Sequence, residues 1–235
     1  MAELVDTSII TTITNTRSPE EHKRLLTLHN SFQPVWLTET IQLGPWLPSD
    51  RDVLVEYLND PRVYSFFSGP PYPYTLQNAD AWLALRADRL TKKGTPLDFA
   101  FRDMARGGRA FGCISISDES DDTLIGDDIG YWLAPEYHGQ GLMAKALKMM
   151  LYRVSLIEVG KRKFNAHAFI GNWASRKTLE KVGFVVQEDM HGTIVKEGKE
   201  IPRWVLRLYV IDEDVARWGE EIREATPLPS LLYKY

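Results

Sequence analysis

The spacing of apolar and polar positions divides the chain into segments with two different periods. Over 97–102 and 111–117 apolar residues alternate with small or polar ones around a turn rich in glycine, which predicts a β-hairpin. Over 142–159 apolar residues return every three or four positions, which predicts the strongest helix of the chain. Further helices are predicted at about 50–59, 76–91 and 173–182, and further strands at 41–46, 129–133, 163–169, 184–188 and 201–210.

The order of these segments indicates the fold class. Strands and helices alternate only in the middle of the chain, and strands pair as hairpins at both ends. An α/β fold of the α+β type, with a mixed, mostly antiparallel sheet flanked by helices, therefore fits better than a fully parallel sheet. We expect an N-terminal arm over 1–33, one domain over 34–211, and a charged helix with a tail over 212–235.

Composition and charge exclude several classes of protein. The 235 residues are 44% apolar, enough for a sizeable core, and 28 basic against 32 acidic side chains give a net charge of −4. An acidic chain has no broad attraction for nucleic acid, and no apolar run approaches the roughly 20 residues that span a bilayer. Because Cys113 is the only cysteine, no internal disulfide can form. We expect a cytoplasmic protein, monomer or homodimer, without nucleic-acid or membrane partners.

The candidate chemistry is concentrated in residues 129–144. A short apolar strand is followed by a loop with Gly139 and Gly141 and then by the first turn of the predicted helix. Glycines let backbone amides approach a ligand closely, and the unpaired amides of a helix start favour an anion such as a diphosphate. A lone Gly-x-Gly is equally typical of a structural turn. A nucleotide-binding module is disfavoured, because neither a Walker lysine nor an acidic ribose ligand accompanies the glycines.

Three motifs together change this picture. They are the strand IGYWL at 129–133, the loop HGQGLMA at 138–144, and Asn172 with Ser175 followed by LEKVGF at 179–184. In type, order and spacing they resemble the GNAT acyltransferase superfamily over about 38–210, and within it the branch of the ribosomal-protein-alanine N-acetyltransferases. The resemblance implies a sheet splayed open between 129–133 and 163–169. Acetyl-CoA would enter on one side as co-substrate and an amine on the other, without a metal.

The resemblance also implies roles for individual residues. Backbone groups of Trp132 and Leu133 would bind the pantetheine arm, loop amides the pyrophosphate, and Asn172 and Ser175 the region near the sulfur. The implied cofactor-binding set is Trp132, Leu133, His138, Gly139, Gln140, Gly141, Leu142, Met143, Ala144, Asn172 and Ser175.

The chain departs from the superfamily pattern at three positions. His138 stands where Arg or Gln is usual, and Met143 where a small residue is usual. Leu179 replaces a tyrosine that protonates the leaving thiolate in many relatives. That role would pass to Ser175, as the resemblance suggests for this branch.

An amine acceptor needs a route for losing its proton. With a pKa near 10.4, only about one alkyl amine in a few thousand is neutral at pH 7. Asp128, just before the splayed strand, and His167, in the middle of the next strand, are the main candidates for the base. Asp127, Glu136 and His138 are weaker ones. A solvated loop acid and a core histidine are the plainer interpretations of the two main candidates, and they stay open.

Two further questions concern the acceptor side and the reaction route. We expect Phe66, Phe67, Tyr72, Tyr74 and Tyr131 to line an acceptor pocket, although clustered aromatic residues are also typical of a core. Cys113 lies between Gly112 and Ile114 in a predicted strand, which favours a core role and hence direct acyl transfer in a ternary complex. The alternative to an N-acetyltransferase is a non-catalytic acyl-CoA-binding sensor that lost the chemistry together with the tyrosine.

Overall fold

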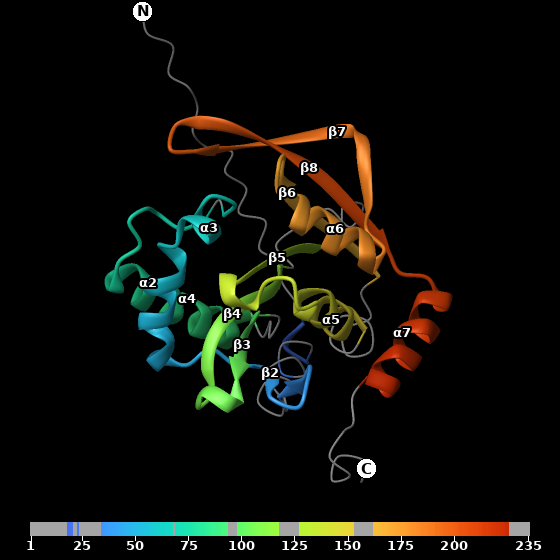
Figure 1. Ribbon diagram of the computed structural model, residues 1–235, viewed down its shortest axis with the longest axis horizontal. Helices are drawn as coiled ribbons and strands as arrows, with labels where there is room; N and C mark the ends of the chain where they lie inside the picture. Colours follow the sequence, from blue (N-terminus) through green and yellow to red (C-terminus); the bar gives the residue numbers. More distant parts are fainter. Residues whose placement is uncertain are drawn as a thin grey trace, which may run out of the picture.

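A computed structural model describes residues 18–20, 23, 34–67, 69–93, 98–117, 127–152 and 162–225. Its strands form a single sheet in the order β1-β2-β3-β4-β5-β6-β8-β7 (Figure 1). Every neighbouring pair is antiparallel except β5 and β6, which are parallel. The strands are β1 (Val35–Trp36), β2 (Ile41–Gly44), β3 (Asp98–Asp103), β4 (Arg109–Ser117), β5 (Asp127–Leu133), β6 (Lys163–Phe169), β7 (Val185–Lys196) and β8 (Lys199–Tyr209).

Helices cover the sheet in two groups. The helices are α2 (Arg51–Leu58), α3 (Pro61–Tyr64), α4 (Leu76–Lys93), α5 (Leu142–Met149), α6 (Trp173–Val182) and α7 (Asp212–Ala225). Helix α2 packs against α4 and β4, whereas α5 packs against α6 and α7. Figure 1 shows the first group beside β3 and β4 and the second beside β5, β6 and β8.

The sheet opens in its middle, between β5 and β6. The two strands pair only where residues 127–129 lie beside 164–166. Beyond that point β5 continues to Leu133 and β6 to Phe169 without pairing with each other. This confirms the predicted fold class, a mixed and mostly antiparallel sheet that is splayed in the middle and flanked by helices.

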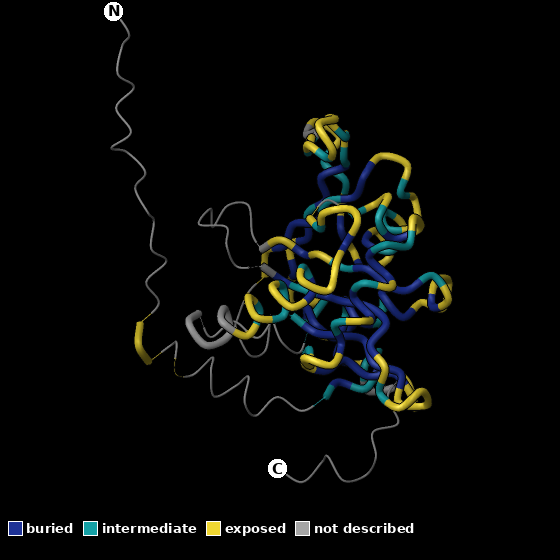
Figure 2. The backbone as a smooth tube through the Cα atoms, turned by 90° about the vertical axis from the view of Figure 1, so that its left-hand side faces the viewer, coloured by how far each residue is buried: buried dark blue, intermediate teal, exposed yellow. Residues whose placement is uncertain are grey.

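The core runs along both sides of the sheet, and its largest fully buried side chains include Phe99, Phe111, Phe164 and Trp218. Figure 2 shows buried backbone through the middle of the molecule and exposed residues mainly on turns and on outer faces of helices. A buried ion pair fixes the start of α2 to the sheet, because the Asp50 carboxylate lies 2.6 Å from the Arg102 guanidinium and each side chain is only 6% exposed. No helix in the described part of the chain has the length and apolar content to cross a membrane.

Most predicted elements are present, and the differences have local causes. Strand β7 extends well past the predicted end at 188, because its pairing with β8 resumes at His191 after an irregularity that follows Val186. Polar residues in that interval, among them Glu188 and Asp189, hide the continuity of the strand in the sequence. The pairing of Lys196 with Lys199 closes the hairpin between β7 and β8, as predicted for the C-terminal end of the domain. Helix α5 passes into a π-helical turn at 150–152, and the rest of the helix predicted to 159 lies outside the described residues, as do 118–126 and nearly all of the predicted arm over 1–33.

Candidate functional site

The glycine loop leads directly into α5. Gly139 and Gly141 have φ values of 74° and 72°, in the left-handed region that side chains disfavour. A Cβ at either position would meet no heavy atom within 4 Å, so the space in front of the loop is open. Gly141 caps α5, and the amides of Leu142, Met143 and Ala144 belong to the first turn, where no intrahelical acceptor exists. The arrangement can bind an anion through backbone groups alone.

Polar side chains brace this loop from behind. The His138 ring Nε2 lies 2.9 Å from the carbonyl oxygen of Leu133, and the Gln140 side-chain amide donates to the carbonyl of Glu136 at 3.0 Å. The Tyr57 hydroxyl donates to the Glu136 carboxylate at 2.6 Å. These contacts tie the loop to the end of β5 and to α2, and they give His138 and Gln140 a loop-shaping role. Their predicted contact with a phosphate stays a prediction.

The end of β5 and the start of α6 meet at a pair of hydroxyl groups. The Asn172 side chain caps α6 by accepting from the backbone N–H of Ser175 at 3.1 Å. The Tyr131 hydroxyl lies 2.9 Å from the Ser175 Oγ. Burial raises the pKa of Tyr131 to about 12, although the hydrogen bond with Ser175 opposes the rise, so the phenol is protonated at neutral pH. Leu179, one turn further along α6, is fully buried.

Asp128 and His167 lie together on the other face of the sheet. Side chains alternate along a strand, so Asp128 points away from the face that Tyr131 and α6 occupy. Asp128 pairs in register with Asn165 of β6, and the His167 Nδ1 lies 3.8 Å from the Asp128 carboxylate. Burial and the nearby positive charge of Arg203 lower the pKa of His167 below its usual value, against the opposing effect of Asp128. His167 is therefore mainly neutral at pH 7 and able to accept a proton.

The splayed part of β5 connects the two faces. Trp132 and Leu133 are both 8% exposed, and their backbone edge toward β6 is not paired with that strand. Such an edge can donate to and accept from an extended amide ligand, the role predicted for the pantetheine arm.

The aromatic residues predicted for the acceptor side are spread over different environments. Phe66 and Tyr72 are exposed, and Tyr72 packs against Tyr64 in a tilted arrangement with ring centroids 4.4 Å apart. Phe67 packs partly against the core, whereas Tyr74 is only 4% exposed and lies within it. The structure therefore does not gather the four into one wall, and an acceptor pocket lined by them stays a prediction.

Cys113 is a core residue on β4. It is 6% exposed, its thiol lies 3.4 Å from the Asp98 carboxylate, and burial raises the pKa of the thiol well above its usual value. A thiol held protonated in this way is a poor nucleophile.

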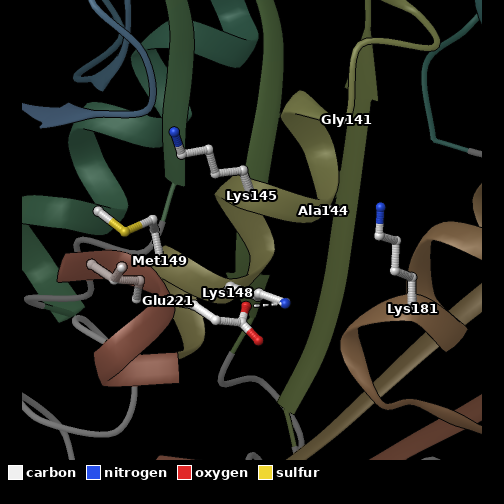
Figure 3. A pocket seen from close by; sticks show the side chains of 8 residues that line it. Gly141, Ala144, Lys145, Lys148, Met149, Lys181 and Glu221 are labelled. Carbon is white, nitrogen blue, oxygen red and sulfur yellow. Dashed lines mark hydrogen bonds and ion pairs between the residues drawn. The ribbon is translucent and has the colours of Figure 1, made fainter. Parts of the chain in front are cut away.

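A cavity that the sequence did not reveal lies beside the glycine loop. It has a volume of about 460 Å³ and is lined by Gly141, Ala144, Lys145, Lys148, Met149, Lys181, Glu221 and Ile222 (Figure 3). The spacing of Lys145 and Lys148 four and seven residues after Gly141 was the available signal, since these positions share a helix face. Lys181 and Glu221 come from α6 and α7, and their position depends on tertiary packing. Within the described ranges, no cluster of three or more His, Cys, Asp or Glu side chains could hold a metal ion.

Comparisons with known proteins agree with this geometry. The acetyltransferase (GNAT) domain family matches residues 40–185. No curated protein sequence matches the chain at a significant level. Among solved structures, the ribosomal-protein-S5-alanine acetyltransferase from Vibrio fischeri has a TM-score of 0.61 at 19% identity, over 76% of this chain and 97% of its own. Mycobacterium smegmatis RimJ, in complex with CoA-disulfide, has a TM-score of 0.60 at 18% identity, over 80% and 93%. A GNAT-family acetyltransferase from Bacillus anthracis has a TM-score of 0.60 at 15% identity, over 75% and 98%. At these identities the structural likeness establishes the fold.

Proposed function

The chain belongs to the GNAT acetyltransferase family and is an acyl-CoA-dependent N-acyltransferase, and from this premise we propose that it transfers an acetyl group from acetyl-CoA directly to a primary amine. The acceptor is a small molecule or a peptide N-terminus. One observation carries the proposal: β5 and β6 separate just beyond Ile129, between the glycine loop at the start of α5 and a mainly neutral histidine.

The donor half of the reaction uses one face of the sheet. The pyrophosphate of acetyl-CoA binds the amides from Gly139 to Ala144, and the open space before the two glycines supports this assignment. The pantetheine arm runs along the unpaired edge of Trp132 and Leu133, which brings the thioester to the opening between β5 and β6. Asn172 and Ser175 then lie next to the sulfur.

The acceptor half uses the other face. His167, with Asp128 beside it, takes a proton from the ammonium form of the acceptor, and the neutral amine attacks the thioester carbonyl. The C–S bond breaks as the tetrahedral intermediate collapses. The departing sulfur takes its proton from Ser175, and Ser175 regains a proton from the nitrogen, which loses it as the amide forms. The Tyr131 hydroxyl holds Ser175 Oγ in place for this step. Since a thiolate with a pKa near 8.5 is a good leaving group, this donor need not be strong.

The acceptor class follows from weaker observations. Structural neighbours include acetyltransferases named for ribosomal proteins, which act on protein substrates according to their names. A second neighbour, MccE, is a self-immunity acetyltransferase whose structure contains acetyl-CoA and AMP. The proposal therefore covers two acceptor classes, a peptide N-terminus and a small amine.

The test is an acetyl-CoA assay with a panel of amines and N-terminal peptides, in which released thiol is followed. We expect turnover with at least one acceptor, and loss of most of it in His167→Gln. Tight binding of acetyl-CoA without turnover on any acceptor would instead support a non-catalytic acyl-CoA sensor. Failure of both CoA and acetyl-CoA to raise the melting temperature would contradict the donor assignment.

A further inference from the structure

Two arginines of β8 lack the carboxylate partner that the other arginines have. Every other arginine whose side chain is described has a guanidinium nitrogen within 3.8 Å of a carboxylate oxygen, as Arg102 has with Asp50. Arg203 and Arg207 form no such pair with the described residues, and the Nε of each is buried without a hydrogen-bond partner among them. Because a partly buried cation without a counter-ion is unfavourable, both positions favour an anion that comes from outside the chain.

The strand register places the two arginines on either side of His167, the proposed base. His167 lies directly opposite Val205, and Arg203 and Arg207 are two positions before and after Val205 on β8. Residues two apart on a strand share a face, and diagonal neighbours on paired strands lie roughly 7–8 Å apart. Strand β6 lies between β5 and β8 (Figure 1), so Asp128 is on one side of His167 and both arginines are on the other.

Gly192 of β7 leaves room for Arg203. The two residues pair in register, and a Cβ at position 192 would lie 2.9 Å from the Arg203 Nε and 3.1 Å from its Cγ. The Arg203 side chain therefore lies across the glycine, where a larger residue would displace it. From this position its charge still reaches His167, because it contributes to the lowered pKa of that histidine.

Deprotonation of an acceptor does not require two cations next to the base. Their charge repels an acceptor whose only charged group is its ammonium, and Asp128 can offset only one of the two charges. An acceptor that also carries an anionic group would be attracted instead. Guanidinium groups suit this task, because they bind carboxylates and phosphates through two parallel hydrogen bonds.

We propose that Arg203 and Arg207 bind a carboxylate or phosphate group of the acceptor, which is therefore an amine with an anionic group a few bonds away. This role rests on the proposed function and narrows its acceptor class. Zwitterionic and acidic amines are selected over alkyl amines that carry only the ammonium charge.

The experiment compares acceptors that differ in the anionic group. On the full chain with acetyl-CoA, kcat/KM is measured for three pairs: an α-amino acid and its amide, phosphoethanolamine and ethanolamine, and C-terminally amidated tetrapeptides with Glu or Gln at the second position. In at least one pair the anionic member should be preferred by about tenfold or more, the range of a charge-assisted hydrogen bond. That pair identifies where on the acceptor the anionic group belongs.

Four variants test the role of the arginines. Arg203→Met and Arg207→Met should each reduce the preference by about tenfold. Arg203→Lys, which keeps the charge but not the paired hydrogen bonds, should retain part of it. Gly192→Ala should also reduce it, because the added methyl group displaces Arg203 without removing a charge. The matched control is Arg106→Met on the turn between β3 and β4, which removes the same charge and should leave the preference intact.

The ratio of the two kcat/KM values separates anion binding from the effect of Arg203 on His167, because a changed pKa of the base alters both members of a pair alike. An unchanged ratio in Arg203→Met and Arg207→Met would overturn the anion site and leave the acetyltransferase proposal standing. Equal kcat/KM values within every pair for the unaltered chain would do the same, as would an equal loss of preference in Arg106→Met. Absence of turnover with every acceptor would contradict the proposed function itself.

Discussion

At the level of single residues, we propose that the contact between Tyr131 and Ser175 compensates for the leucine at position 179. Leu179 is buried in the core and carries no hydroxyl group that could donate a proton. The phenol comes from β5 instead and touches the hydroxyl proposed to protonate the thiolate. The sequence predicts Tyr131 on the acceptor side. It cannot show that Tyr131 turns toward α6, because that orientation follows from the strand register.

Tyr131→Phe should lower kcat by about fivefold and leave the KM for acetyl-CoA nearly unchanged. The substitution removes one hydrogen bond from Ser175, worth about 1 kcal/mol, but retains the ring. Steady-state kinetics measures both constants. Tyr209→Phe, on an exposed residue of β8, is the control and should have no effect. A kcat equal to that of the unaltered chain would show that Ser175 needs no such partner.

The state of His167 predicts how activity depends on pH. Its pKa is lowered by burial and by Arg203, so the neutral form that accepts a proton persists at pH values below 6.5. We expect kcat/KM to fall as the pH drops through that lowered pKa, and His167→Gln to remove this acidic limb along with most of the activity. Activity profiles between pH 5 and 8 on both proteins measure the effect. An acidic limb that survives in the variant would assign the base to Asp128 or to another group.

At the level of elements, the loop between β5 and α5 was the most predictable part of the site. Its glycines, the strand before it and the helix after it are all visible in the local sequence. The cavity beside the glycine loop was not predictable in the same way, because α5, α6 and α7 contribute to it from distant parts of the chain. The pairing of Asp128 with His167 likewise depends on the parallel register of β5 and β6. A site formed by consecutive residues can thus be predicted from the sequence, whereas a site formed by several elements can be found only once the fold is known.

Gly141→Val should weaken acetyl-CoA binding by at least tenfold. The valine side chain would enter the space before the amides of α5, and the φ of 72° strains any side chain. Gly198→Val is a matched control, because Gly198 has a φ of 74°, is equally open, and lies in the distant β7–β8 turn. Both variants should lose similar stability in thermal melts, and only Gly141→Val should lose affinity in calorimetry. An equal affinity for the two variants would contradict the loop assignment.

At the level of the whole molecule, α7 packs against α5, on the side of the sheet that we propose binds the donor. Trp218 is fully buried, α7 packs against α5, and Glu221 reaches Lys148. The sequence predicts that residues from 212 form a segment outside the domain over 34–211. Helix α7 contributes both to the core and to the cavity beside the glycine loop. We therefore expect that loosening α7 weakens binding at the proposed donor site.

Trp218→Ala should reduce the free energy of unfolding by about 3–5 kcal/mol, since truncating a fully buried tryptophan removes its transfer energy and leaves a cavity. In the described part of the structure the Trp218 indole N–H has no hydrogen-bond partner, so Trp218→Phe keeps most of the apolar contact without losing a polar one. The Phe variant should therefore lie much closer to the unaltered chain in urea unfolding. If α7 and the donor site are linked, acetyl-CoA should bind the Ala variant more weakly and the Phe variant almost normally. Full stability of the Ala variant would mean that α7 is not docked as the structure has it, whereas lower stability with unchanged affinity would separate the helix from the donor site.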